Sequence, residues 1–450
     1  MPDPRVVFAA PKSGSGKTTV TCGVLQALHD RGMNVVSMKC GPDYIDPMYE
    51  ERVIGVPAAN LDLFFTPEET LRRLFLKQAK GAEISVIEGV MGYYDGLGAA
   101  TDEASTFKVA EALRAPVVLI LDARGQSLSA LAELQGFLRF REDSRIRGVI
   151  FNRMSAHIYK ALAPEVEKMG VRPLGFLPKI PDLTIESRHL GLQLPEEIAD
   201  LSEKLHALAE TLLETVDLDA FIALANEAEP LAAPPEPEVQ EGPKVKIAAA
   251  KDEAFCFYYK DNLELLERMG AEITFFSPIH DRRIPEGAEG LILPGGYPEL
   301  YAEALSENTE MREGIALAIR NGLPCLAECG GFMYLHREME DMDGRSWPVC
   351  GVIGAKAWKT DRLGRFGYVT LTANGENGWL PEGEEIRAHE FHYFESGDCG
   401  SAMHAEKPAG SRSWDCIHAE GNLFAGFPHL YYESDPQFIA RFLRRCAGEE

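Results

Sequence analysis

Short apolar runs alternate with longer amphipathic stretches along the first half of the chain. Runs of this kind are typical of strands buried on both faces, and the amphipathic stretches between them favour helices that cover those faces. The pattern therefore predicts an α/β domain with a parallel sheet. The predicted strands are V-V-F-A-A at Val6, N-V-V-S-M at Asn34, I-S-V-I-E at Ile84, P-V-V-L-I-L-D at Pro116 and I-R-G-V-I-F-N at Ile146.

The second half of the chain starts a new series of the same kind. We predict strands at V-K-I-A-A-A, E-I-T-F-F and G-L-I-L-P, and a helix within the amphipathic run from Tyr258 to Met269. Between Asn226 and Pro243 the chain has five prolines, five glutamates and no basic residue. That composition cannot bury a core, and proline stiffens it, so it predicts a semi-extended linker. We therefore expect two domains, 1–225 and 244–450, joined by a linker at 226–243.

The amino-acid composition of the chain disfavours several classes of binding partner. The 450-residue chain has a formal net charge of −25, which disfavours nucleic acid because such partners are bound mainly through clustered Lys and Arg. It has no apolar stretch of about 18 residues, so we expect no membrane association and a cytoplasmic location. Its nine cysteines show no C-x-x-C spacing, which disfavours disulfides and structural zinc. Small molecules are the expected ligands.

A glycine-rich loop follows the first predicted strand. Its sequence, P-K-S-G-S-G-K-T-T, matches the last three positions of the phosphate-loop pattern G-x-x-x-x-G-K-[ST], while Pro11 stands where the first glycine belongs. The alternative is an ordinary glycine-rich turn, but the order of strand, loop and helix favours phosphate binding. The expected ATP-binding residues of this loop are Gly14, Ser15, Gly16, Lys17, Thr18 and Thr19.

Carboxylates follow two further predicted strands, at the edge where open parallel sheets bind ligands. Asp43 and Asp46 come after the second strand, while Glu88 and Asp95 come at and after the third. Hard oxygen ligands suit Mg²⁺, so we expect Thr18 and Glu88 to hold it, with Asp43 as a further ligand. Asp-Pro and Asp-Gly also form turns, which is the alternative for Asp46 and Asp95.

Two other segments have candidate chemistry. Asn152, at the end of the fifth predicted strand, is placed to contact a nucleotide base, although Asn at a strand end is often a turn former. In L-A-E-C-G-G-F-M-Y-L, from Leu326 to Leu335, Cys329 stands before two glycines. The thiol is either a packed core residue or a nucleophile on a sharp turn between a strand and a helix. From these ten residues alone, both interpretations stay open.

Taken together, these motifs resemble the cobyrinic acid a,c-diamide synthase family. The resemblance runs nearly end to end and is based on K-S-G-S-G-K-T-T, K-C-G-P-D-Y-I-D-P, E-G-V-M-G-Y-Y-D-G, R-H-L-G-L at Arg188 and A-E-C-G-G-F-M-Y-L. It implies an ATP-binding amidoligase domain with a P-loop like that of dethiobiotin synthetase, followed by a class I glutamine amidotransferase domain. It also implies that ATP, with Mg²⁺, activates two carboxylates of a corrin precursor as acyl phosphates, and that ammonia from glutamine displaces the phosphate. No tightly bound organic cofactor is expected.

The resemblance also implies roles for individual residues. Cys329 would attack the glutamine carboxamide, His429 would be its base, and the backbone N–H groups at Gly330 and Gly296 would stabilise the oxyanion. Many amidotransferases of this fold have a carboxylate two residues after the histidine, where this chain has Tyr431, so we consider Glu433 or a backbone carbonyl to orient the imidazole. The substrate-side residues implied by the family are Tyr44, Asp46 and Asp95, together with the carboxylates named above.

Several alternatives stay open at this point. The same diamidation could act on nickel-sirohydrochlorin or hydrogenobyrinic acid, because these macrocycles share the two carboxylated arms. Cobyric acid synthase is a sibling that typically has a Gln-Asn loop where Gly41 to Asp46 stand here. A different class is a P-loop ATPase switch with an inactive amidotransferase-like module, favoured by Lys12, which occupies the place of the signature lysine of such dimeric ATPases. The expected partners are ATP, L-glutamine and a corrinoid or related tetrapyrrole, and a homodimer is one option for the assembly.

Overall fold

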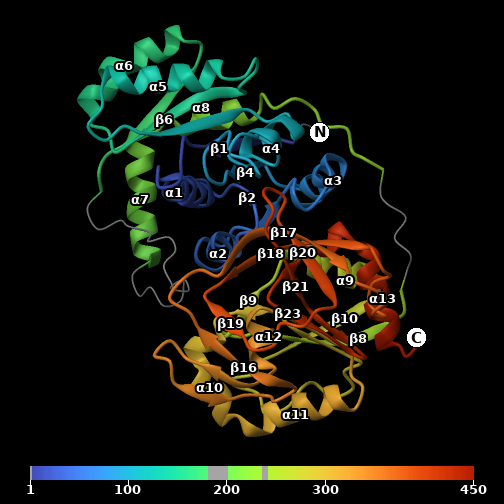
Figure 1. The fold of residues 1–450 in the computed structure, drawn as a ribbon. Helices are drawn as coiled ribbons and strands as arrows, with labels where there is room; N and C mark the ends of the chain where they lie inside the picture. Colours follow the sequence, from blue (N-terminus) through green and yellow to red (C-terminus); the bar gives the residue numbers. More distant parts are fainter. Residues whose placement is uncertain (1–2, 181–200, 236–241, 450) are drawn as a thin grey trace. The chain divides into compact units, whose positions relative to one another are not determined.

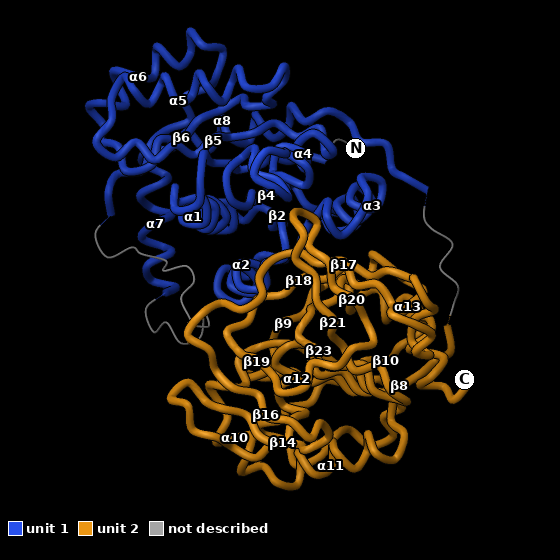
Figure 2. The backbone as a smooth tube through the Cα atoms, in the orientation of Figure 1, with its two compact units in different colours: residues 1–236 blue, residues 237–450 orange. Residues whose placement is uncertain are grey.

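The computed structural model describes residues 3–180, 201–235 and 242–449. The chain divides into two compact units, Met1–Glu236 and Pro237–Glu450 (Figure 2). The R-H-L-G-L motif at Arg188 and positions 236–241 of the predicted linker lie outside the described residues. No helix within the described part of the chain combines the length and the apolar character needed to span a membrane.

A seven-stranded parallel sheet organises unit 1, in the order β3-β2-β4-β1-β5-β6-β7 (Figure 1). All five predicted strands are confirmed. The structure adds β3 and β7 at the two edges, where A-A-N-L is short and R-P-L-G-F-L is interrupted by Pro and Gly, so neither has a clear apolar run. The strands are β1 (Arg5–Ala9), β2 (Val35–Cys40), β3 (Ala58–Leu61), β4 (Ile84–Glu88), β5 (Val117–Asp122), β6 (Ile146–Asn152) and β7 (Arg172–Leu177).

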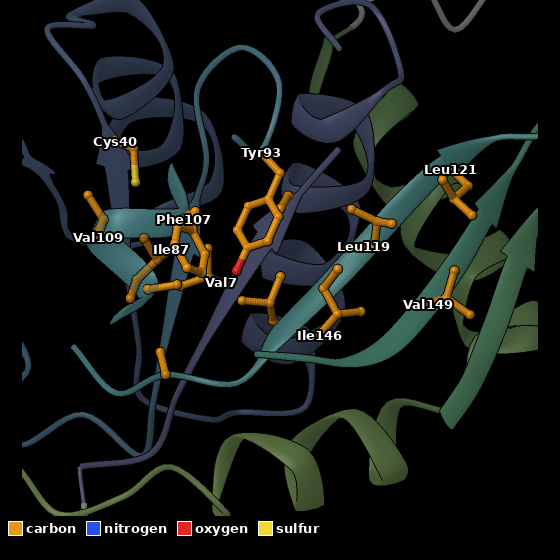
Figure 3. Close-up of a cluster of buried hydrophobic side chains, with 14 of the residues drawn as sticks. Val7, Cys40, Ile87, Tyr93, Phe107, Val109, Leu119, Leu121, Ile146 and Val149 are labelled. Atoms are coloured by element: carbon orange, nitrogen blue, oxygen red, sulfur yellow. The ribbon is translucent and has the colours of Figure 1, made fainter. Parts of the chain in front are cut away.

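Each face of this sheet has its own apolar core, because successive side chains of a strand point to opposite faces. Val7 of β1 belongs to the cluster shown in Figure 3, with Ile87, Phe107 and Leu119. Val6 belongs to the opposite cluster, which includes residues of α1, α7 and α8. The helices are α1 (Lys17–Asp30), α2 (Ile45–Tyr49), the π-helical turn η1 (Glu50–Ile54), α3 (Glu68–Gln78), α4 (Thr106–Ala112), α5 (Leu128–Arg139), α6 (Ala156–Lys168), α7 (Leu201–Thr215) and α8 (Leu218–Ala225).

Unit 2 is built around a six-stranded sheet in the order β10-β8-β11-β13-β23-β22, in which only β22 is antiparallel to its neighbour. The three predicted strands of this half and its helix are confirmed as β8, β10, β11 and α9. The elements of this layer are β8 (Val245–Ala250), α9 (Lys260–Arg268), β10 (Ala271–Phe276), β11 (Gly290–Leu293), η3 (Pro298–Tyr301), α10 (Ala302–Glu307), α11 (Thr309–Arg320), β13 (Cys325–Glu328), α12 (Gly330–Tyr334), β22 (His418–Glu420), β23 (Leu423–Gly426), η4 (Tyr432–Ser434) and α13 (Pro436–Cys446).

Three smaller sheets complete unit 2: β12-β9, β15-β14-β16-β19 and β21-β20-β17-β18-β24. The last of these packs Val369 and Ala388 into the same core as Ile247 and Leu326 of the central sheet, and it carries the C-terminal histidine segment. Its strands and those of the other two sheets are β9 (Phe255–Phe257), β12 (Gly295–Gly296), β14 (His336–Glu340), β15 (Ser346–Pro348), β16 (Ile353–Lys359), β17 (Arg365–Ala373), β18 (Glu385–His392), β19 (Phe394–Ser396), β20 (Met403–Glu406), β21 (Ser413–Cys416) and β24 (His429–Leu430).

Candidate functional site

The glycine-rich loop of unit 1 lies between β1 and the N-terminus of α1. Gly14 and Gly16 have φ angles of 76° and 93°, a region that favours glycine. An added Cβ at Gly16 would lie 2.1 Å from Asn152 Nδ2, so this position also needs glycine for space. The first turn of α1 has no acidic residue, which leaves its N-terminal N–H groups and their partial positive charge available to an anion.

Asn152 lies beneath this loop. Its side chain is buried, and Nδ2 donates a hydrogen bond of 2.8 Å to the carbonyl oxygen of Ser15. The neighbouring Arg153 donates to the carbonyl of Gly14 at 2.9 Å and pairs with Asp122 at 3.0 Å. Both side chains therefore brace the loop backbone, and a contact between Asn152 and a nucleotide base stays a prediction. Arg153 was not predicted, although it follows Asn152 directly in the sequence.

A chain of polar contacts connects α1, β2 and β4. Thr18 Oγ1 donates to Glu88 Oε1 at 2.7 Å, and Lys39 Nζ lies 2.5 Å from both Glu88 Oε1 and Asp46 Oδ2. Lys17 reaches across to the carbonyl of Met91 at 2.6 Å. The structure thus brings together Thr18, Glu88 and Asp46 of the predicted set, and adds Lys39 of β2.

The electrostatics of this chain keep Lys39 charged. Burial would lower the pKa of its amine, but Asp46 and Glu88 raise that pKa well above its ordinary value. Glu88 is fully buried, and its Oε2 has no hydrogen-bond partner among the described residues. Nearby, burial and the charge of Glu88 raise the pKa of Glu50 well above the usual carboxyl range. The cluster therefore holds a buried ammonium at Lys39 and, at Glu88 Oε2, a buried carboxylate oxygen without a hydrogen-bond partner among the described residues.

The other predicted carboxylates hold turns in this structure. Asp43 Oδ1 accepts backbone hydrogen bonds from Ile45 at 2.9 Å and Asp46 at 3.2 Å, and Asp95 Oδ2 accepts one from Gly92 at 2.9 Å. Tyr44 directly precedes α2. The described residues contain no group of three or more His, Cys, Asp or Glu side chains that could hold a metal on their own. A cation here would need oxygen ligands from a phosphate or water as well.

Cys329 of unit 2 occupies a sharp turn between β13 and α12. Its φ of 47° and ψ of −102° are rare for a residue with a side chain, and such strain in a strand-to-helix turn is typical of nucleophile positions. The backbone N–H of Cys329 donates to the carbonyl of Gly426 in β23 at 2.8 Å. The sequence left packing and catalysis equally open, and this backbone favours catalysis, because a residue needed only for packing gains nothing from the strain.

The two glycines after Cys329 allow close approach by a neighbouring chain segment. An added Cβ at Gly330 would lie 2.8 Å from Pro298 Cδ and 3.1 Å from the backbone nitrogen of Gly296. At Gly331 it would lie 2.0 Å from the carbonyl oxygen of Leu293. The backbone N–H groups predicted to stabilise an oxyanion, at Gly330 and Gly296, therefore come from segments that are in direct contact.

His429 lies against the same segment. An added Cβ at Gly295 would lie 2.2 Å from His429 Cε1, and β23, which binds the backbone of Cys329, ends three residues before His429. Burial, with a smaller effect of His392, lowers the pKa of His429 to about 3, so the imidazole is neutral at pH 7. Burial, followed by the charge of Glu299, raises the pKa of the Cys329 thiol above its ordinary value. The site therefore holds a thiol in its protonated form and a neutral imidazole.

The structure does not support Glu433 as the residue that orients His429. Glu433 Oε1 accepts a hydrogen bond of 2.8 Å from Arg268, and Tyr431 donates to Asp261 at 2.8 Å. The carboxylate near the imidazole is Glu328, which the sequence analysis did not single out. Glu328 directly precedes Cys329 in A-E-C-G-G, and this position next to the candidate nucleophile could have identified it from the sequence.

The histidine-rich segment from Arg387 to Glu395 is divided between two strands. The chain breaks at Tyr393: β18 pairs with β17 and β24, while β19 pairs with β16 in a different sheet. His392 is buried, with its ring stacked on Phe427 at 4.0 Å and Nε2 3.3 Å from Glu390 Oε2. The change of sheet places Ala388 and Phe394 in different apolar cores, which one continuous strand could not do.

Comparisons with known proteins give matches to both halves of the chain. Residues 6–192 match the CobQ/CobB/MinD/ParA nucleotide binding domain, and residues 246–437 match the CobB/CobQ-like glutamine amidotransferase domain. The cobyrinate a,c-diamide synthase of Caldanaerobacter subterraneus is 39% identical, with 98% of each chain covered. That of Listeria innocua is also 39% identical, covering 97% of this chain and 98% of the relative. The hydrogenobyrinate a,c-diamide synthase of Streptomyces coelicolor is 37% identical, covering 98% of this chain and 97% of the relative.

Proposed function

The chain belongs to the cobyrinate a,c-diamide synthase family, and we propose that it amidates the a and c side-chain carboxylates of cobyrinic acid with ATP and glutamine. It is a glutamine-dependent ligase with a nucleotide-binding domain. The observation that carries the proposal is the presence, in one chain, of a phosphate loop whose Thr18 contacts Glu88 and of a strained Cys329 turn. The first feature serves activation of an acid, and the second serves release of nitrogen.

The ligase half must make an unreactive carboxylate electrophilic. Ammonia cannot displace oxide, so the γ-phosphoryl group of ATP is first transferred to the carboxylate oxygen, which gives an acyl phosphate and ADP. Such a transfer depends on positioning and on neutralising phosphate charge. We assign the phosphate cradle to the loop residues Gly14 to Thr19, with Lys17 and the N-terminus of α1 supplying positive charge.

The residues present fit a Mg²⁺ ion in this site. Glu88 Oε2 is buried and without a hydrogen-bond partner among the described residues, and Thr18 lies beside the same carboxylate. Thr18 and Glu88 would hold the ion together with phosphate oxygens, and Mg²⁺ would neutralise charge on the transferred group. Asp43 stays a candidate further ligand. Tyr44, Asp46 and Asp95 are proposed to contact the macrocycle arm, with Lys39 fixing Asp46.

The amidotransferase half releases ammonia from glutamine. Cys329 Sγ bonds to the carboxamide carbon, His429 takes the thiol proton, and the N–H groups of Gly330 and Gly296 receive the oxyanion. The C–N bond then breaks, His429 passes its proton to the departing ammonia, and water hydrolyses the thioester to glutamate. The neutral imidazole described above is the form of His429 that this sequence of steps requires.

The choice among macrocycles rests on the named relatives. Cobyrinate is the substrate in the names of two relatives at 39% identity, and hydrogenobyrinate in that of one at 37%, while nickel-sirohydrochlorin has no such support. The switch hypothesis is not favoured, because Lys12 offers only its backbone carbonyl, to Ser15, in the described contacts and the full-length relatives are named as synthases. We also propose a cytoplasmic location, because all nine cysteines are free thiols. A homodimer stays a prediction.

One assay tests the proposal. The pure protein is incubated with ATP, Mg²⁺, glutamine and, in separate reactions, each of the three macrocycles, and the products are analysed by mass spectrometry. Two replacements of a hydroxyl by an amine on cobyrinic acid, with two ATP consumed, are expected. A rate of ATP hydrolysis that does not change when the macrocycle or glutamine is added would contradict the proposal.

A further inference from the structure

We propose that Glu328 is the positioning carboxylate of the amidotransferase site, which holds the His429 imidazole for proton transfer from Cys329. The inference rests on the proposed function, because it concerns the glutamine-hydrolysing half of that reaction. Glu328 Oε2 lies 3.9 Å from His429 Nδ1, and the two side chains are 12% and 2% exposed. A carboxylate at that nitrogen leaves Nε2 as the nitrogen that serves the thiol.

The fold fixes the position of Glu328 from several sides. The parallel register of β13 and β23 places Glu328 opposite Gly426, three residues before His429. The backbone N–H of Leu430 and the hydroxyl of Tyr432 both donate to the carboxylate, the latter to Oε1 at 3.4 Å. The Tyr432 contact uses Oε1, whereas Oε2 is the oxygen 3.9 Å from the imidazole. Glu328 therefore reaches the histidine from the strand that also ends in the nucleophile.

The usual position for such a carboxylate cannot serve here. Tyr431 stands two residues after His429, and its hydroxyl donates a hydrogen bond to Asp261. Glu433 accepts a hydrogen bond from Arg268. Asn262 fixes the same segment through Leu430 and Tyr432, at 2.8 Å in each case. The backbone after His429 is therefore held in place by α9. Many amidotransferases of this fold orient the histidine with a carboxylate two residues after it. In this chain, Glu328, which directly precedes Cys329, takes that role.

The chemistry of the step explains why a carboxylate is useful. When Cys329 attacks the glutamine carboxamide, its thiol proton moves to His429 and creates a buried imidazolium until the proton passes to the leaving ammonia. A buried cation is costly unless an anion lies close to it. Burial raises the pKa of Glu328 to about 8, so without a cation beside it this carboxyl favours its neutral form near neutral pH. A cation on His429 favours the ionised form of Glu328.

Several titratable side chains from neighbouring elements surround Glu328, His429 and Cys329. Tyr258 and Tyr432 face Glu328, His392 acts on His429, and Glu299 and Glu390 act on the Cys329 thiol. The two tyrosines carry no charge near neutral pH, and a carboxylate near Glu328 would oppose its ionisation. The imidazolium itself is thus the group that brings Glu328 to its charged form.

The test compares nitrogen donors in the full chain with ATP, Mg²⁺ and cobyrinic acid. For Glu328→Gln we expect the glutamine-dependent kcat to fall on the order of 10²-fold, within the range of general acid–base effects, with KM for glutamine and the ammonium-dependent rate unchanged. Glu328→Asp, which keeps the carboxylate, should recover part of the loss. Glutamine hydrolysis by the wild type should rise with an ionisation near pH 8 that Glu328→Gln lacks.

Glu433→Gln is the matched control, because it removes a carboxylate of the same segment, whose Oε1 accepts a hydrogen bond from Arg268. It should keep the ratio of glutamine-dependent to ammonium-dependent rates. Equal loss of both rates in Glu328→Gln, or loss of glutamine use in Glu433→Gln, would overturn the inference. A wild-type chain that amidates with neither donor would instead refute the proposed function, whereas full glutamine use by Glu328→Gln would refute this inference alone.

Discussion

Replacement of Lys39 by Met tests the electrostatic design of the ligase site. The side chains of Lys39 and Glu88 are 4% and 1% exposed, and the amine lies 2.5 Å from both Glu88 Oε1 and Asp46 Oδ2. Methionine has nearly the same length and volume, so the change removes the charge without opening a cavity. It leaves Glu88 buried beside a second carboxylate, and Thr18 still donates a hydrogen bond to Glu88 Oε1.

The magnitude follows from the cost of an uncompensated buried charge. Removing one partner of a buried ion pair costs about 3–5 kcal/mol. In a domain of 150–250 residues, 1 kcal/mol lowers Tm by about 2–4 °C, so Lys39→Met should lower the Tm of unit 1 by about 6–20 °C. Lys108→Met is the matched control, because Lys108 pairs with Glu111 on the surface of the same unit, at 37% and 48% exposure. Such surface pairs are worth at most about 1 kcal/mol.

Thermal and urea unfolding of the full chain measure the stability, and amidation with ammonium as the nitrogen donor measures the ligase. Lys39→Met should lose most ligase activity, since Glu88 and Asp46 lose the cation that fixes them. The double variant Lys39→Met/Glu88→Gln should recover part of the stability, because it buries no isolated charge. A Tm of Lys39→Met within 2 °C of the control, or a double variant less stable than the single one, would refute the reasoning.

Three further predictions concern unit 2. Cys329→Ser should abolish glutamine-dependent amidation and keep ammonium-dependent amidation, and retained glutamine use would contradict the nucleophile assignment. Gly331→Ala should lower the free energy of unfolding in urea by about 1–3 kcal/mol, because the added Cβ would lie 2.0 Å from the carbonyl oxygen of Leu293. The control is Gly314→Ala in α11, where the added Cβ meets open space, and it should be neutral or stabilising. Burial lowers the pKa of His336 to about 4, so its neutral form is favoured in the fold, and stability should fall as pH drops from about 6.5 to 4. His336→Phe should flatten that part of the profile, and an unchanged pH slope would count against the shift.

The amino-acid sequence by itself determined the class of fold and supplied the candidate reacting groups. Both depend on short-range features: uninterrupted apolar runs predict buried parallel strands, and the spacing of Gly16, Lys17 and Thr18 is set by one loop and one helix turn. The edge strands β3 and β7 escaped prediction for the same reason, because their residues have no local pattern and are held by pairing with a neighbour.

Only the tertiary structure decided which side chains meet. Lys39 and Glu88 are 49 residues apart, and Glu328 and His429 about 100 apart, so their contacts depend on strand order and register rather than on local sequence. The same holds for Asn152, whose position under the phosphate loop follows from β6 lying two strands from β1. The tertiary structure also sets protonation, because the atoms packed around Glu328 and His429 displace water and shift the pKa of each side chain. Sequence supplies the groups, and long-range packing sets their neighbours and their charge.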